Sequence, residues 1–193
     1  MTLTVDDLRR HLGIGSYTGN EGNTELERAL TAASKAVERY CIRTFAAPPD
    51  TASTRIYDQS NLVPVSGRWR MYVDDFVDDP DTITESCDRV TWTTVTDDWF
   101  SSPDNAETRY VLEGRYWDRH VKVTAKWGVG PELLAEVELP TLMKAAQLFK
   151  RRDSVNGVEG FGEFGVVRIT KSADPHIAEL LDPLVRTDRM GIA

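Results

Sequence analysis

The chain has 193 residues, of which 40% are hydrophobic and 28% are charged, and its formal net charge is −8 with a pI near 4.9. It contains no run of about 18 apolar residues, and its start, MTLTVDDLRRHLGIG, carries charges where a signal peptide is apolar, so neither a membrane span nor that route of secretion is expected. The acidic balance argues against a protein that holds nucleic acid by neutralising phosphates with clustered Lys and Arg.

Two helices are predicted at the start of the chain. Thr4 and Asp7 fit a capping box ahead of Leu8, and Gly13 follows the last helical position. A second helix is predicted after the polar residues 17–23, with Thr24 and Glu27 as its capping box. Its buried face is expected to carry the residues at helical spacing: Leu26, Ala29, Leu30, Ala33, Val37, Tyr40 and Cys41.

Beyond Pro48 the sequence changes to short β-branched and aromatic runs between turn formers. Strands are predicted at 54–57, 61–65, 70–73, 88–94, 109–113 and 120–127. In the last of these, Val121, Val123, Ala125 and Trp127 share one face and alternate with polar residues, which predicts a half-exposed sheet. Whether the strands form one sheet or two is left open.

Two acid-rich stretches, 74–88 and 96–107, are predicted to be solvated loops, because runs of like charge usually are. A calcium site is the alternative interpretation. The EF-hand spacing is absent, however, so Asp74, Asp75, Asp78 and Asp79 do not form a recognisable cation loop.

The last part of the chain is predicted to be helical again. Pro140 is placed as the first residue of a third helix, which ends near Lys150 to Arg152. A short closing helix is predicted from Pro175 to Leu181, with Asp174 as its N-cap. The tail from Pro183 onward is expected to be loose unless a partner orders it.

The stretch GFGEFG, Gly160 to Gly165, fits the G-x-G-x-x-G pattern of dinucleotide-binding loops. A cofactor loop must leave a strand and open a helix, whereas this stretch follows a predicted helix and precedes the strand-like run 166–170. The sequence therefore predicts a flexible helix-to-strand connection and no cofactor.

The remaining candidate groups give no recognisable reactive site. Cys41 and Cys87 lack a C-x-x-C spacing and are predicted to be buried free thiols. His11, His120 and His176 lack metal-ligand spacing and are predicted to be surface or capping residues. The five tryptophans all fall in the β-rich middle and are predicted to anchor the core or a subunit interface: Trp69, Trp92, Trp99, Trp117 and Trp127.

The order of these features resembles the head-tail connector (adaptor) proteins of tailed bacteriophages. The segments that carry the resemblance are Leu3 to Ile14, Ala33 to Phe45, Val121 to Gly128 and Ile177 to Arg186. The expected fold is α+β: a small helical core of about four helices, formed by 1–47 and 129–193, with a β-rich insertion, 48–128, between the second and third main helices. The insertion looks larger than a minimal family member needs.

The resemblance implies a structural virion protein without enzymatic activity or cofactor. It would form a homo-oligomeric ring, typically of twelve copies, below the portal protein, and would extend the DNA channel toward a tail-side completion protein. DNA would pass without sequence-specific binding, no membrane is involved, and the protein would be in the host cytoplasm during assembly. The predicted assembly interface combines the glycine-rich loop with the C-terminal segment: Gly157, Gly160, Phe161, Gly162, Phe164, Gly165, Leu184 and Arg186.

Two alternatives remain open. One is a tail-completion or tail-terminator protein, which also forms rings but docks on the tail side. The other is a small enzyme that uses the acidic middle of the chain with a divalent cation.

Overall fold

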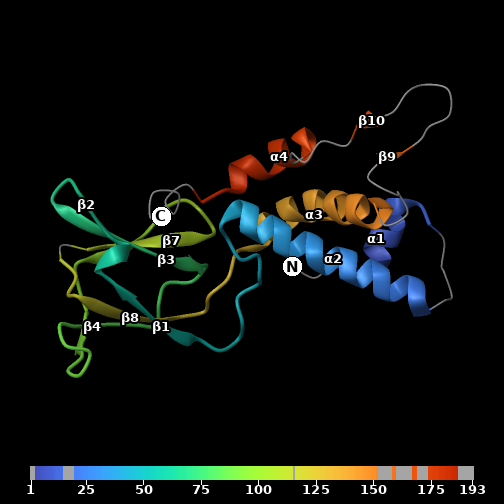
Figure 1. Ribbon diagram of the computed structural model, residues 1–193. Coiled ribbons are helices and arrows are strands. Elements are labelled where there is room, and N and C mark those ends of the chain that lie inside the picture. Colours follow the sequence, from blue (N-terminus) through green and yellow to red (C-terminus); the bar gives the residue numbers. More distant parts are fainter. Residues whose placement is uncertain are drawn as a thin grey trace. The chain divides into compact units, whose positions relative to one another are not determined.

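In the computed structural model of the chain, two helices precede a β-rich segment in the sequence and two follow it among the described residues (Figure 1). The structure describes residues 3–14, 20–114, 116–151, 158–159, 167–168 and 174–186. Within these ranges the α-helices are α1 (Val5–Leu12), α2 (Asn20–Cys41), α3 (Pro131–Arg151) and α4 (Pro175–Leu181), and 3-10 turns cover η1 (Gln59–Asn61) and η3 (Asp182–Leu184). None of the described helices is both long and apolar enough to cross a membrane.

The strands of the middle segment form two antiparallel four-stranded sheets. The first has the order β1 (Ser53–Asp58), β8 (His120–Ala125), β4 (Thr82–Ser86), β5 (Thr93–Thr94). The second has the order β2 (Leu62–Val65), β3 (Arg68–Phe76), β7 (Arg109–Gly114), β6 (Trp99–Ser102). The predicted class, α+β with a β-rich insertion between the second and third helices, is confirmed, and the insertion contains two sheets.

The chain divides into two compact units. The helical unit comprises Met1–Arg43 and Ala135–Arg186, and the sheet unit comprises Thr44–Leu134 among the described residues. The sequence-based bounds, 47/48 and 128/129, lie a few residues from these junctions. The sheet unit also holds most of the charge, because residues 44–134 contain 16 acidic and 9 basic side chains, a net −7 of the total −8.

The helical unit begins with the helix cap that the sequence predicts. The Asp7 amide donates to Thr4 Oγ1 at 3.2 Å, and the Thr4 amide donates to Asp7 Oδ2 at 2.9 Å, so both halves of the capping box are present. Gly13 ends α1 with φ 68°, a conformation that costs glycine little. One core joins the three longer elements, α1, α2 and α3: Leu8, Leu26, Leu30, Ala33, Ala145 and Ala146.

Two predictions for α2 are wrong in detail. The helix begins at Asn20, so Thr24 lies inside it and does not cap it. The Arg9 side chain of α1 donates a hydrogen bond to the Asn23 side chain, and this tertiary contact supports the extra turn despite the weak helix propensity of Gly22. Of the predicted buried face, all members are buried except Tyr40, which is 38% exposed.

The start of α3 was also predicted wrongly. The helix begins at Pro131, whose missing N–H costs nothing at a first helical position, and Pro140 lies inside it. Pro140 is buried, so packing holds a residue that would otherwise interrupt the helix. The prediction for α4 is confirmed: Asp174 caps it by accepting a hydrogen bond from the His176 amide at 3.0 Å.

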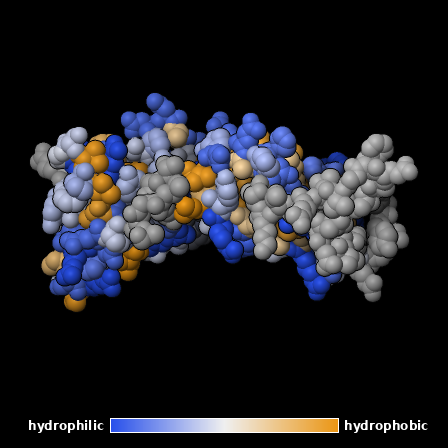
Figure 2. All heavy atoms as spheres, turned by 45° about the horizontal axis from the view of Figure 1, so that its top comes forward, coloured by the Kyte–Doolittle hydropathy of each residue, from blue (hydrophilic) through white to orange (hydrophobic). Residues whose placement is uncertain are grey.

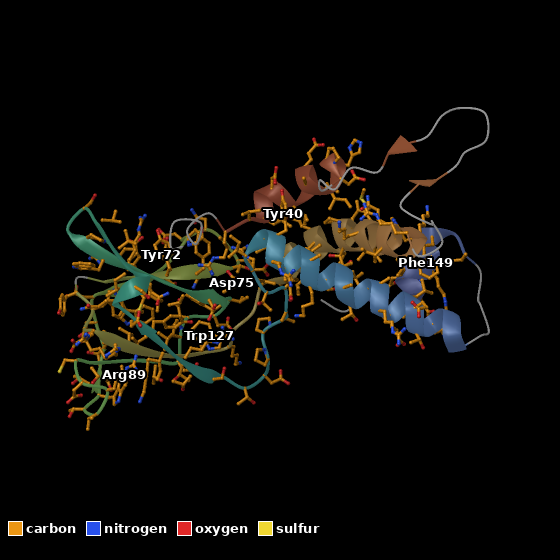
Figure 3. The ribbon with its side chains drawn as sticks, in the orientation of Figure 1. Tyr40, Tyr72, Asp75, Arg89, Trp127 and Phe149 are labelled. Carbon is orange, nitrogen blue, oxygen red and sulfur yellow. The ribbon has the colours of Figure 1, made fainter. Side chains whose placement is uncertain are left out.

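The sheet unit is built around side chains from both sheets. Its core contains Tyr57, Met71, Val73, Phe76, Ile83, Leu112, Trp117, Val121, Val123, Ala125 and Trp127. The alternation predicted in β8 is confirmed, since its apolar members are buried and Lys122 and Thr124 are half-buried. Trp127, labelled in Figure 3, donates its indole N–H to the Ser53 carbonyl at 2.8 Å and meets Phe76 edge-on.

The two acid-rich stretches are not simply loops. Each contains a strand that the sequence analysis missed: β4, with Ile83 in the core, and β6, with Trp99 packed against it. Conversely, the strand predicted at 88–94 shortens to β5, Thr93–Thr94. Each missed strand contributes one large apolar side chain among acidic neighbours, so tertiary packing overrides a sequence pattern typical of a loop.

Candidate assembly surfaces

The glycine-rich stretch connects two short antiparallel strands, β9 (Val158–Glu159) and β10 (Val167–Arg168). A strand thus precedes it as well as follows it, which corrects the predicted helix-to-strand connection. The arrangement differs from a dinucleotide site, in which a helix follows the loop. Gly157, Gly160, Phe161, Gly162, Phe164 and Gly165 lie outside the described residues.

The other two predicted interface residues lie inside the helical unit. Leu184 is 4% and Arg186 2% exposed, and the Arg186 amide donates to the Cys41 carbonyl at 3.0 Å. The expectation of a loose tail is therefore wrong for residues 183–186, which η3 and this hydrogen bond fix next to the end of α2. Contact of Leu184 or Arg186 with another subunit stays a prediction.

A polar contact joins the end of α2 to the segment after α4. The Tyr40 hydroxyl donates to Asp182 Oδ1 at 2.5 Å, and this bond to a carboxylate raises the pKa of Tyr40. Tyr40 is labelled in Figure 3 near the end of α2. It also borders a small apolar groove of about 110 Å³ between α2, α3 and α4, with Val37, Ile177 and Leu181 in its wall. Sequence reasoning missed the pair, because the two residues are 142 positions apart.

Several cations of the sheet unit lie over aromatic rings. The Arg68 guanidinium is 5.0 Å from the ring centre of Phe100, and Lys122 Nζ is 3.7 Å from that of Trp92. These are attractive contacts on partly exposed surfaces. The prediction of a core role is confirmed for four of the five tryptophans: Trp117 and Trp127 are buried, and Trp69 and Trp99 pack against the same cluster, whereas Trp92 is not part of it. A role at a subunit interface stays a prediction.

The acidic side chains of the sheet unit are partly satisfied by neighbours. Asp79 Oδ1 accepts from Ser101 Oγ at 2.6 Å and from Arg109 Nη1 at 2.8 Å, beside an open polar cleft of about 450 Å³. Among the described residues, no group of three or more His, Cys, Asp or Glu is placed to hold a metal ion. Backbone amides of Thr91 and Val90 lower the pKa of Asp88, which organises a turn.

The cysteines and histidines lie apart from one another. Both thiols are free; Cys41 is buried, and burial raises its pKa to about 11, whereas Cys87 is exposed, against the prediction. His11 and His176 are exposed, and the half-buried His120, at the start of β8, accepts from Arg89 Nε at its Nδ1 at 3.3 Å. These positions agree with surface roles for the histidines.

The visible surface offers no single large apolar patch. Figure 2 shows hydrophobic atoms in small separate groups among hydrophilic ones on the face that it presents. The described residues with large exposed apolar side chains include Val90, Tyr116, Ile56, Leu139, Phe100 and Val63. Single exposed apolar residues are ordinary on a protein surface, so exposure alone does not mark any of them as part of an interface.

The fold has relatives among solved structures, although no family model and no curated protein sequence matches the chain. One is a chain of the neck of an empty gene transfer agent (GTA) particle computed with C6 symmetry: the TM-score is 0.54 at 17% identity, and the match covers 96% of this chain and 90% of that chain. A chain of the virion of a native GTA particle has a TM-score of 0.50 at 17% identity, with the same coverage. A chain of the neck of a native GTA particle computed with C12 symmetry has a TM-score of 0.49 at 16% identity, covering 95% and 88%.

The chain thus has the fold of a component of a phage-like particle neck, over almost its whole length. The resemblance to head-tail connector proteins, predicted from the order of sequence features, is confirmed at the level of the fold.

Proposed function

We propose that the chain is a structural protein of the head-tail junction in a tailed bacteriophage or phage-like particle, where copies of it form a ring below the portal. The observation that carries this proposal is the fold shared along 96% of the chain with a component of a particle neck computed with C6 symmetry. A ring of twelve copies, expected from the family resemblance, is compatible with sixfold symmetry.

The charge of the chain supports a role beside DNA without binding to it. A net charge of −8 gives little attraction through release of counterions from phosphates, so DNA would pass along such a ring without sticking. In a closed ring each copy presents two different surfaces to its neighbours. We propose for contact with a neighbouring copy or ring the sequence between β9 and β10, which contains Phe161 and Phe164, and the segment around Leu184 and Arg186, whose exposed members are Asp182 and Pro183.

The test is assembly. Mass photometry and negative-stain imaging of the purified chain, alone and mixed with the portal protein, should show rings; a monomer that stays monomeric at high concentration and does not join the portal would refute the proposal. Capture by tail-tube protein but not by portal would instead assign the tail-completion or tail-terminator role. A thermal shift with calcium, magnesium or manganese would favour the metal-dependent enzyme.

The sequence between β9 and β10 is tested by a double variant, Phe161→Ser with Phe164→Ser. It should fold normally and assemble less well, because two apolar anchors are lost from the proposed contact. Tyr116→Ser is the control, since Tyr116 is a 66% exposed aromatic residue of the sheet unit. If the double variant assembles at the same concentration as the wild type, Phe161 and Phe164 make no contact that assembly needs.

A further inference from the structure

Strand β1 forms one edge of the first sheet and differs from the other edge strands. It pairs with β8 over six residues, Ser53 to Asp58, in a regular antiparallel register without a bulge. Among the described residues, no other backbone segment hydrogen-bonds to it from the opposite side. A long regular edge of this kind is a template for another strand.

The three other edge strands carry features that block pairing. β2 contains Pro64, which has no N–H to donate, and β5 has only two residues. β6 has four residues and is followed directly by Pro103. Short strands and prolines are the usual protections of sheet edges, so β1 is the edge that this unit leaves open.

The outward side chains of β1 agree with this. Ile56 is 54% exposed on the face opposite the core and lies next to Lys122 of β8. The charged residues of the strand are engaged within the chain: Arg55 pairs with Asp74 and lies over Trp127, and Asp58 accepts from the Ser60 amide. An apolar residue thus stands at the centre of the exposed edge, and the charges that usually prevent edge-to-edge pairing are bound to neighbours.

A complementary segment occurs elsewhere in the same chain. Strands β9 and β10 pair only with each other in the described structure, as a two-stranded sheet of two residues each. A hairpin of this size is marginally stable by itself and gains stability when it joins a larger sheet. The sequence around β10, Val166 to Lys171, is β-branched and carries two cations and no anion, whereas residues 44–134 carry a net −7.

We propose that β1 is a docking edge to which β10 of a second copy of this chain adds as a further strand. The inference rests on the proposed ring. Among the described residues β1 has a strand on one side only and β10 pairs only with β9, and addition from a neighbouring copy would extend both sheets at once. Such a contact joins two different surfaces, as a closed ring requires.

Cysteine cross-linking tests the contact directly in the full-length chain, in a Cys87→Ser background that retains the buried Cys41. Thr54→Cys, Ile56→Cys or Asp58→Cys in one population is mixed with Val167→Cys or Arg168→Cys in the other. Val167 and Arg168 point to opposite faces of β10, so the test does not depend on the register in which β10 pairs with β1. Mild oxidation should give reducible dimers in at least one mixture and none in a single population of β10 variants.

A charge variant provides the second measurement. Ile56→Lys should fold, because position 56 is exposed and a lysine there keeps its ammonium group in solvent, and it should raise the concentration for half-assembly about tenfold, which corresponds to about 1.4 kcal/mol. A lysine on an edge strand opposes pairing and repels the two cations near β10. Val63→Lys is the matched control: Val63 is 38% exposed on edge strand β2, opposite Arg70 and next to Pro64, as Ile56 is opposite Lys122. It should assemble like the wild type.

The outcomes separate the two proposals. Rings that form without any cross-link, and equally well with Ile56→Lys, overturn the docking edge and leave the ring intact. A double-cysteine chain that closes only an intrachain disulfide, with no dimer from mixed populations, overturns the second copy as the occupant. A wild-type chain that assembles neither alone nor with the portal refutes the ring and the docking edge with it.

Discussion

Gly128 follows Trp127 at a point where the backbone of the sheet unit passes close to residues 46–48. A Cβ atom built on Gly128 would lie 2.5 Å from Pro48 N, 2.7 Å from Ala46 O and 2.8 Å from Ala47 C. These are main-chain atoms, so no side-chain rotation relieves the overlap. The adjoining backbone hydrogen bonds, Gly128 N to Asp75 O at 2.8 Å and Val129 N to Ala46 O at 2.9 Å, hold both segments in place.

Gly128→Ala should therefore lower the free energy of unfolding of the sheet unit by about 3 kcal/mol. Overpacking contributes about 1–3 kcal/mol, and weakening of the two hydrogen bonds contributes about 0.5–1.5 kcal/mol each. All five tryptophans lie in the sheet unit, so urea unfolding followed by tryptophan fluorescence reports on this unit. A change in midpoint at constant m-value gives the free energy directly.

Gly130→Ala is the matched control. There the new Cβ meets the carboxylate end of Glu107, a flexible side chain that can turn away at the cost of one exposed hydrogen bond to the Glu132 amide. The expected loss is under about 1 kcal/mol. Equal losses for the two alanine variants, or a Gly128→Ala protein as stable as the wild type, would contradict the steric argument.

Three further predictions concern other groups. Tyr40→Phe removes the hydroxyl that donates to Asp182 and should raise amide hydrogen exchange in α4 and η3. Because the pKa of Tyr40 is raised in the folded chain, the stabilisation from this hydrogen bond is complete below the unfolded pKa of 10.0 and disappears as the pH rises through the folded pKa. The hydroxyl and the amide of Thr4 donate to the Asp7 carboxylate and lower the pKa of Asp7. The stabilisation from Asp7 is therefore present above the unfolded pKa of 3.8 and disappears as the pH falls through the folded pKa. Asp7→Asn should remove this pH dependence from an acid titration of the fold followed by circular dichroism. A thiol reagent should label Cys87 at once and Cys41 only on unfolding; rapid labelling of two thiols per native chain would contradict the burial of Cys41.

Local signals in the sequence were sufficient where neighbouring residues fix the structure. The capping box of Thr4 and Asp7, the Asp174 cap of α4 and the alternation in β8 were all predicted and are all present. Each depends on contacts within a few residues or on strict periodicity, which a single sequence displays.

Long-range packing decided the elements that the sequence did not reveal. Ile83 and Trp99 lie among acidic residues and form strands only because both reach a shared core. Pro140 marks a helix start by local rules, yet burial keeps it inside α3. The glycine-rich loop stays a prediction as an interface. Local reasoning missed the pairing of Tyr40 with Asp182 and the open edge of β1, because both exist only in the folded chain.

The negative charge of the sheet unit should make assembly of the chain depend on ionic strength. In the proposed ring, units of net −7 would lie next to one another, so each added subunit would work against an electrostatic repulsion that a free chain does not feel. Screening shortens this repulsion to about 8 Å at physiological ionic strength and less in concentrated salt. Ring formation should therefore strengthen as salt is added, the reverse of what a DNA-binding protein shows, and ionic strength would set the concentration at which the ring closes.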